Sequence, residues 1–175
     1  KDHSKQTILI VGGSSGSRII NTAIRGLLPE LLKNYNVIHL CGKDNLDETL
    51  TETTGYAQFE YANKELSDMF ALADLVISRA GANAICELLA LRKPNILIPL
   101  SAAASRGDQI LNANSFRSQG FSYVLEEEDL SNTTLLEAIE HVFQKKEEYI
   151  KAMENSNSRN SIDTIIGLIL DASKK

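Results

Sequence analysis

The stretch of the chain best suited to chemistry is SRAGANAICE, residues 78–87. The apolar run before it, residues 73–77, is rich in branched side chains and is typical of a buried strand. Apart from Arg79, small residues lead from this run into a helical segment, and Gly81 lets a ligand come close to the backbone. A strand that passes into a helix in this way leaves free N–H groups at the positive end of the helix dipole. The stretch therefore predicts a site for an anion.

Glu87 is the charged side chain that this junction would bring to the anion. It lies about one and a half turns into the expected helix, and its neighbours on that helix are uncharged. A carboxylate that can accept bonds from two hydroxyl groups suits a ribose, as in other parallel sheets that bind nucleotides. The alternative is an ordinary helix carboxylate that faces solvent, which helical periodicity alone would favour.

A second loop with similar properties is GGSSGS, residues 12–17. It follows the apolar run 7–11 and precedes a helical stripe of apolar residues over 19–32. The order strand, glycine loop, helix is the geometry that cradles phosphate groups. The loop matches neither the dinucleotide fingerprint nor the P-loop motif, so taken alone it is equally consistent with a tight turn.

The polar pair Asp108 and Gln109 follows a third loop of small residues. Adjacent carboxylate and amide groups can hold sugar hydroxyls by direct hydrogen bonds, although Asp108 could instead cap the helix that begins there. Arg79 is equally consistent with a phosphate-binding cation and with a surface charge, and His39 is expected in the core or at an interface. Two anion sites, a carboxylate and a polar pair together suit the diphosphate, ribose and sugar of a nucleotide sugar.

Apolar runs and helical stripes alternate along the chain and must position these loops. Strands are expected at residues 7–11, 36–42, 56–61, 74–78, 95–100 and 121–125, and helices at 19–32, 44–52, 66–72, 82–91, 108–116, 130–143, 145–154 and 160–175. This alternation predicts an α/β fold, a parallel sheet with helices on both faces in a Rossmann-like arrangement. Ligands bind beyond the carboxyl ends of such strands, so the loops that follow the strands are expected to share one rim. The charged helix over 145–154 is expected to lie in solvent.

The composition narrows the class of protein. The 175 residues are enough for one domain with a full core, and 43% apolar and 23% charged residues are ordinary for a soluble globular protein. The net charge of −5 argues against a nucleic-acid partner, and the apolar runs are too short to span a bilayer. Cys41 and Cys86 are too few for a disulfide framework and favour a reducing cytoplasm. No cluster of cysteine and histidine suggests a metal.

Three motifs, in the same order along the chain, resemble one family. They are GGSSGSRIIN at 12–21, SRAGANAICE at 78–87 and SRGDQILNA at 105–113. From about Thr7 onward the chain resembles the C-terminal domain of the MurG family, the peptidoglycan N-acetylglucosaminyltransferases, in its Gram-positive form. The resemblance implies the C-terminal half of a two-domain GT-B fold, with the N-terminal acceptor domain absent. Residues 1–175 would form a single UDP-GlcNAc-binding domain, with 1–6 as a linker.

The resemblance also implies a role for particular residues. The diphosphate is assigned to Gly13 and Ser14, the uracil to Tyr61 and Ala62, the phosphate and sugar to Gly81, Ala82, Asn83 and Ala84, the ribose hydroxyls to Glu87, and the GlcNAc to Asp108 and Gln109. Ser14 is also expected to cap the following helix, and the alternative for Tyr61 is a packed aromatic at the end of a strand. Many members of the family carry two glutamines where this chain has Asp108 and Gln109.

The implied reaction is the transfer of GlcNAc from UDP-GlcNAc to the muramyl 4-hydroxyl of lipid I, which makes lipid II in peptidoglycan synthesis. It inverts the anomeric carbon, and neither a cofactor nor a metal is expected. A general base must deprotonate the acceptor hydroxyl. The family places that base in the absent domain, so no catalytic residue is assigned and this chain alone is expected to be inactive. The full-length enzyme is expected in the cytoplasm, where it meets lipid I peripherally on the inner face of the cell membrane.

Two other functions share this architecture. One is a stand-alone donor-binding subunit of a two-chain glycosyltransferase with a membrane-anchored partner. Such subunits usually begin with their own methionine, whereas this chain starts at Lys1, so a piece of a longer protein is expected instead. The other is a UDP-GlcNAc 2-epimerase, which would need catalytic carboxylates and a histidine that the sequence does not place.

Overall fold

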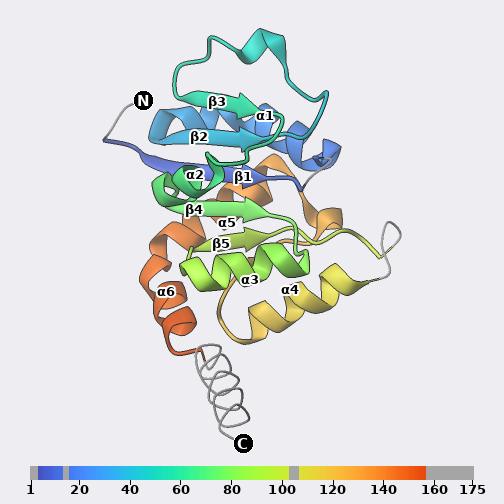
Figure 1. Cartoon of the computed structure of the whole chain (residues 1–175), viewed down its shortest axis with the longest axis vertical. Coiled ribbons are helices and arrows are strands. Elements are labelled where there is room, and N and C mark those ends of the chain that lie inside the picture. The colour runs from blue at the N-terminus through green and yellow to red at the C-terminus, as the bar shows by residue number, and fades with distance from the viewer. Residues whose placement is uncertain (1–3, 14–15, 103–106, 157–175) are drawn as a thin grey trace, which may run out of the picture.

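Six strands form one sheet in the computed structural model, which describes residues 4–13, 16–102 and 107–156 (Figure 1). The strands are β1 (Gln6–Val11), β2 (Tyr35–Leu40), β3 (Tyr56–Phe59), β4 (Leu75–Ser78), β5 (Asn95–Leu97) and β6 (Tyr123–Val124). Their order is β3-β2-β1-β4-β5-β6, and every neighbouring pair is parallel. The chain therefore moves outward from β1 to one edge and then from β4 to the other. The crevice between β1 and β4 is where sheets of this kind bind ligands.

Helices cover both faces of the sheet, as the alternating pattern predicted. They are α1 (Arg18–Asn34), α2 (Leu66–Leu72), α3 (Ala82–Leu91), α4 (Asp108–Ser118), α5 (Asn132–Gln144) and α6 (Lys146–Glu154), with short 3-10 turns at η1 (Glu48–Leu50) and η2 (Glu127–Asp129). In Figure 1, α2, α3 and α4 lie in front of the sheet, and α1 and α5 lie behind it. None of the helices in the described ranges has both the length and the apolar composition needed to cross a bilayer.

Alternation of side chains along the strands divides the apolar interior into two cores. Ile8 and Ile10 of β1 belong to the core shared with α1 and α5, whereas Leu9 between them belongs to the core shared with α2, α3 and α4. Because both faces are covered, the central strands are apolar on both sides. A continuous apolar run in the sequence was therefore enough to predict each central strand.

Several expected elements are shorter than the sequence predicted; β3, for example, ends at Phe59 rather than at residue 61, and β6 contains only two residues. Two further cases have a direct physical reason. The segment 44–52, expected as a helix, contains only the turn η1 because it has no apolar stripe to bury. Strand β5 ends at Leu97 rather than at residue 100, since Pro99 has no N–H with which to continue the ladder. The expected helix at 160–175 lies outside the described residues.

The helix α6 was expected to lie in solvent, and this expectation is wrong. Its Met153 is buried in the core on the α3 side, and Tyr149 packs against both cores. Lys146 forms an ion pair of 3.2 Å with Asp74, whose other oxygen accepts a hydrogen bond of 2.9 Å from the backbone N–H of Thr7. Thr7 lies near the start of β1, and Asp74 immediately precedes β4. The helix thus fastens the two cores together at the amino edge of the sheet.

His39 lies in the core, as expected, and is part of a buried hydrogen-bonded chain. Its Nδ1 is 2.9 Å from the hydroxyl of Tyr56, and its Nε2 is 2.9 Å from Oδ1 of Asn21. The amide nitrogen of Asn21 donates in turn to the carbonyl of Cys41 at 2.8 Å. Burial, followed by the charge of Arg25, lowers the pKa of His39 from 6.5 to about 4. The neutral imidazole therefore joins α1, β2 and β3.

This pKa predicts that acid destabilises the fold through His39. Between pH 6.5 and pH 4 the unfolded chain binds a proton that the folded chain does not, so stability is lost as the pH falls through this window. From pH 7.5 to pH 5 the loss from this group is about 2 kcal/mol. Urea unfolding at both pH values should show a smaller difference for His39→Gln than for the unaltered chain. His141→Gln controls for removal of a histidine elsewhere, and an undiminished difference in His39→Gln would contradict the assignment.

Candidate functional site

A cleft of about 540 Å³ opens at the carboxyl edge of the sheet, where β1, β4 and β5 end. It is lined by Val11, Gly12, Gly13, Gly16, Ser78, Arg79, Gly81, Ala82, Asn83, Ala84, Leu100 and Gln109. The structure thus brings together most of the predicted site residues that come from three separate loops. Nowhere in the described ranges do three or more histidine, cysteine or carboxylate side chains form a group that could hold a metal ion.

The glycine loop after β1 makes the first wall of the cleft. Gly16 has a φ of 73°, and a Cβ built on it would lie 2.1 Å from the carbonyl oxygen of Cys41. The loop therefore turns too tightly for any side chain at this position. Helix α1 is capped by Ser17, whose Oγ accepts from the N–H of Ile20 at 3.4 Å. The expectation that Ser14 caps α1 is therefore wrong, because the chain turns into the helix three residues later; Ser14 itself lies outside the described residues.

The start of α3 makes the second wall. Gly81 is its N-cap residue and has no side chain to occupy the first N–H groups, and the first helical bond runs from Ile85 N to Gly81 O at 3.0 Å. The N–H groups of residues 82–84 therefore have no partner within the helix. A Cβ built on Gly81 would meet nothing within 4 Å. An open helix N-terminus facing a cleft binds anions through these N–H groups and the helix dipole.

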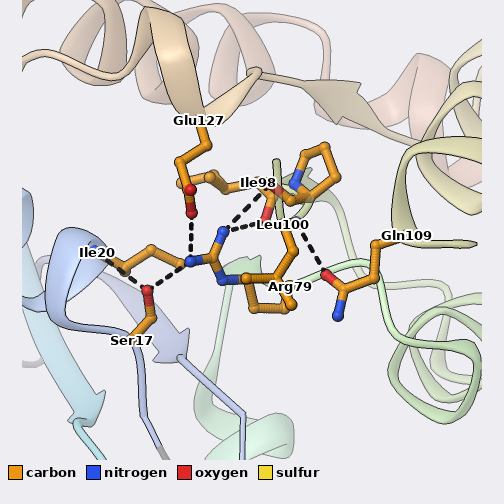
Figure 2. A network of polar contacts seen from close by, with 8 residues as sticks. Ser17, Ile20, Arg79, Ile98, Leu100, Gln109 and Glu127 are labelled. Carbon is orange, nitrogen blue, oxygen red and sulfur yellow. Dashed lines mark hydrogen bonds and ion pairs between the residues drawn. The ribbon is translucent and has the colours of Figure 1, made fainter. Parts of the chain in front are cut away.

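The start of α4 makes the third wall. The side-chain oxygen of Gln109 accepts a hydrogen bond of 3.1 Å from the N–H of Leu100, as Figure 2 shows. This contact fixes which end of the amide faces the cleft, so its NH₂ group is available to donate to a ligand. Asp108 is exposed and does not line the cleft. It does not cap α4 either, because the N-cap position belongs to Gly107 with φ 85°.

Besides Asp108, three more predicted residues lie outside the cleft. Glu87 is exposed on α3, four residues after Asn83 and so one turn further along the same face. Tyr61 follows β3 and is 63% exposed, so the alternative of a packed aromatic is wrong. Ala62 beside it is partly buried against the core on the α3 side. In the sheet β2 lies between β1, which precedes the glycine loop, and β3, which precedes Tyr61. A ligand touching all of these residues must extend out of the cleft along its rim.

Arg79 differs from both interpretations that its sequence position allowed. It is only 8% exposed, so it is not a surface charge. Its guanidinium lies 2.5 Å from the carboxylate of Glu127, a residue of η2, so it is not an unpaired cation either (Figure 2). Glu127 follows β6, far along the chain, and no local sequence pattern indicates that it pairs with Arg79. The one sign in the sequence that Arg79 is buried was its position directly after a buried strand.

The sequence model of the glycosyltransferase family 28 C-terminal domain matches residues 7–166. The chain belongs to this family. The chain is 65% identical over 162 residues to the "UDP-N-acetylglucosamine--N-acetylmuramyl-(pentapeptide) pyrophosphoryl-undecaprenol N-acetylglucosamine transferase" of Lachnoclostridium phytofermentans, which covers 93% of this chain and 46% of that protein. It is 58% identical over 170 residues to the enzyme of the same name from Lachnospira eligens, covering 97% of this chain and 48% of that protein.

The solved structures agree with this family. The crystal structure of Acinetobacter baumannii MurG superposes with a TM-score of 0.76 at 21% sequence identity, over 95% of this chain and 51% of that one. The resemblance to MurG and the Rossmann-like half of a GT-B fold are thus confirmed. The chain spans about half the length of the curated relatives it matches.

Gly16 and Gly81 lie in opposite walls of the cleft, and substitution by alanine should change the stability of the fold differently at the two positions. Gly16→Ala is expected to destabilise the fold by about 3 kcal/mol or more, since it combines a positive φ with a contact against backbone. Gly81→Ala is expected to leave stability within about 1 kcal/mol, because its φ of −67° suits alanine and the added methyl enters open space. Urea unfolding followed by circular dichroism measures both. Equal destabilisation by the two variants would show that the walls are not built as described.

Proposed function

We propose that this chain is the donor-binding domain of the transferase that moves GlcNAc from UDP-GlcNAc to lipid I. The observation that carries the proposal is the open N-terminus of α3, which faces a glycine loop across the cleft between β1 and β4. The names of the curated relatives supply the donor and the acceptor. These relatives are about twice as long as this chain, which favours the interpretation that it is one half of a single-chain enzyme rather than a separate donor-binding subunit.

The diphosphate would lie between the two walls. The N–H groups of residues 82–84 would donate to its oxygens, and Gly13, together with Ser14, would contact it from the other side. When the bond between the anomeric carbon and the phosphate oxygen breaks, negative charge grows on the leaving UDP. The positive end of α3 is aimed at that charge, which is the way a preorganised site stabilises a transition state.

The ribose and the base would extend outward along the rim. Glu87 lies about 7–8 Å along α3 from Ala82, a distance that a nucleotide can bridge between its diphosphate and its ribose hydroxyls. Tyr61 and Ala62 would lie near the uracil. Binding of the ribose would give Glu87 the partners that an exposed carboxylate otherwise finds in water.

The sugar would lie at the start of α4. The NH₂ group of Gln109 faces the cleft and would donate to an oxygen of GlcNAc, with Asp108 at the mouth accepting from a hydroxyl. The acceptor, lipid I, and the general base that deprotonates it would be supplied by the other half of the full-length protein. That protein would work in the cytoplasm, on the inner surface of the cell membrane.

The carboxylate is tested by UDP binding. Isothermal titration calorimetry of the 175-residue chain should give heat with UDP and much less with ADP. Glu87→Ala should weaken UDP binding roughly ten- to a hundredfold, because hydrogen bonds to a charged group contribute about 1.5–3 kcal/mol. Glu137→Ala, which removes an exposed carboxylate from α5, is the matched control. Absence of UDP heat, equal heats for the two nucleotides, or an unchanged Kd in Glu87→Ala would each count against the proposal.

The sugar contact is tested by Gln109→Glu. The new carboxylate can still accept from Leu100 N–H and suits the first turn of a helix, but it replaces a donor to the sugar by an acceptor. Affinity for UDP-GlcNAc should fall about tenfold further than affinity for UDP, which senses only the added negative charge. Gln119→Glu makes the same change at the other end of α4 and should alter neither affinity. An equal loss for UDP and UDP-GlcNAc would remove Gln109 from the sugar site.

A further inference from the structure

The guanidinium of Arg79 is the point at which three separate segments meet beneath the cleft. One terminal nitrogen donates to the carbonyls of Ile98 and Pro99, at 3.1 and 3.2 Å. The other donates to Oγ of Ser17 at 2.7 Å and contacts the carboxylate of Glu127 at 2.5 Å. Figure 2 shows these partners arranged around one side chain.

This arrangement leaves Arg79 poorly suited to bind a phosphate itself. Its two terminal nitrogens carry four N–H bonds in all; three of the partners above accept hydrogen bonds from them, and the fourth, Glu127, forms an ion pair. The side chains of Arg79 and Glu127 are 10% and 9% exposed, so the positive charge is balanced where solvent hardly enters. Arg79 lines the cleft, yet its two terminal nitrogens point into the protein.

The partners of Arg79 are connected to both sides of the cleft. Ser17 caps α1 and is the last residue of the glycine loop, so it links the guanidinium to the end of that loop. Residues 98 and 99 directly precede Leu100, whose N–H holds the side chain of Gln109. Replacing a buried ion pair by apolar groups often leaves stability unchanged, so stability alone does not account for charges at this place.

We propose that Arg79, held by Glu127, is a positioning residue that sets the spacing between the glycine loop and the chain after β5. The inference rests on the proposed function, because the spacing matters for a diphosphate bound between these walls. Loss of the guanidinium would let the Ser17 end of the loop move away from the cleft. The diphosphate would then lose loop contacts, while a ligand without phosphates would lose none.

The test compares UDP with uridine in Arg79→Met and Ser17→Ala. Calorimetry for UDP and ligand-observed NMR for uridine should show a UDP affinity lowered about tenfold in each variant and a uridine affinity unchanged. Ser17 does not line the cleft in the described structure, so its substitution reaches the diphosphate only through the loop. The double variant should lose little more than either single variant, because both break the same connection.

Ser131→Ala is the matched control, since it removes the same kind of helix cap from α5 and should leave the UDP affinity unchanged. If Arg79→Met does not fold, Ser17→Ala still gives the result, because it leaves the ion pair with Glu127 in place. Unaltered UDP affinity in Ser17→Ala, or equal losses for UDP and uridine in either variant, would overturn the positioning role alone. Absence of UDP binding in the unaltered chain would overturn the proposed function and the positioning role with it.

Discussion

The architecture of the cleft depends on a close approach of backbone to backbone at the carbonyl of Cys41. Gly16 lies against this oxygen with no room for a side chain. Asn21 donates to the same oxygen from the first turns of α1, and His39 holds the other end of that amide. A single carbonyl after β2 thus holds α1 through Asn21 and leaves room only for glycine at position 16. The chain can only make this turn because the residue there is glycine.

Among the described residues, the electrostatics of the cleft come from backbone rather than from free cations. The described lining contains one charged side chain, Arg79, and Glu127 balances it. What remains for an anion is the N–H groups and the dipole at the start of α3. Such donors are fixed by the fold and do not reorganise when charge develops on a ligand. This agrees with the net charge of −5, because local attraction here needs no basic surface.

Much of the fold was predictable from the sequence because each central strand is a short apolar run between loops of small residues. The shared rim followed from parallel topology, and the cleft contains the predicted Gly13, Gly81 and Gln109. Caps were assigned less well, since the start of a helix depends on where the loop turns. A cap at Ser14 or at Asp108 differs from the observed one by only a few residues. The partner of Arg79 was beyond prediction, because nothing local indicates a contact with a residue so distant along the chain.

The fastening of α6 at the amino edge has a consequence for how such a domain can diversify. Asp74 and Lys146 tie β4 to α6, the hydrogen bond from Thr7 adds β1, and Lys93 donates to the carbonyl of Ala73 at 2.9 Å on the same edge. These ties lie at the opposite end of the strands from the cleft. Substitutions and insertions in the loops at the carboxyl end leave these ties untouched. A descendant could therefore bind another sugar or base after changes in those loops, while its scaffold stayed as it is.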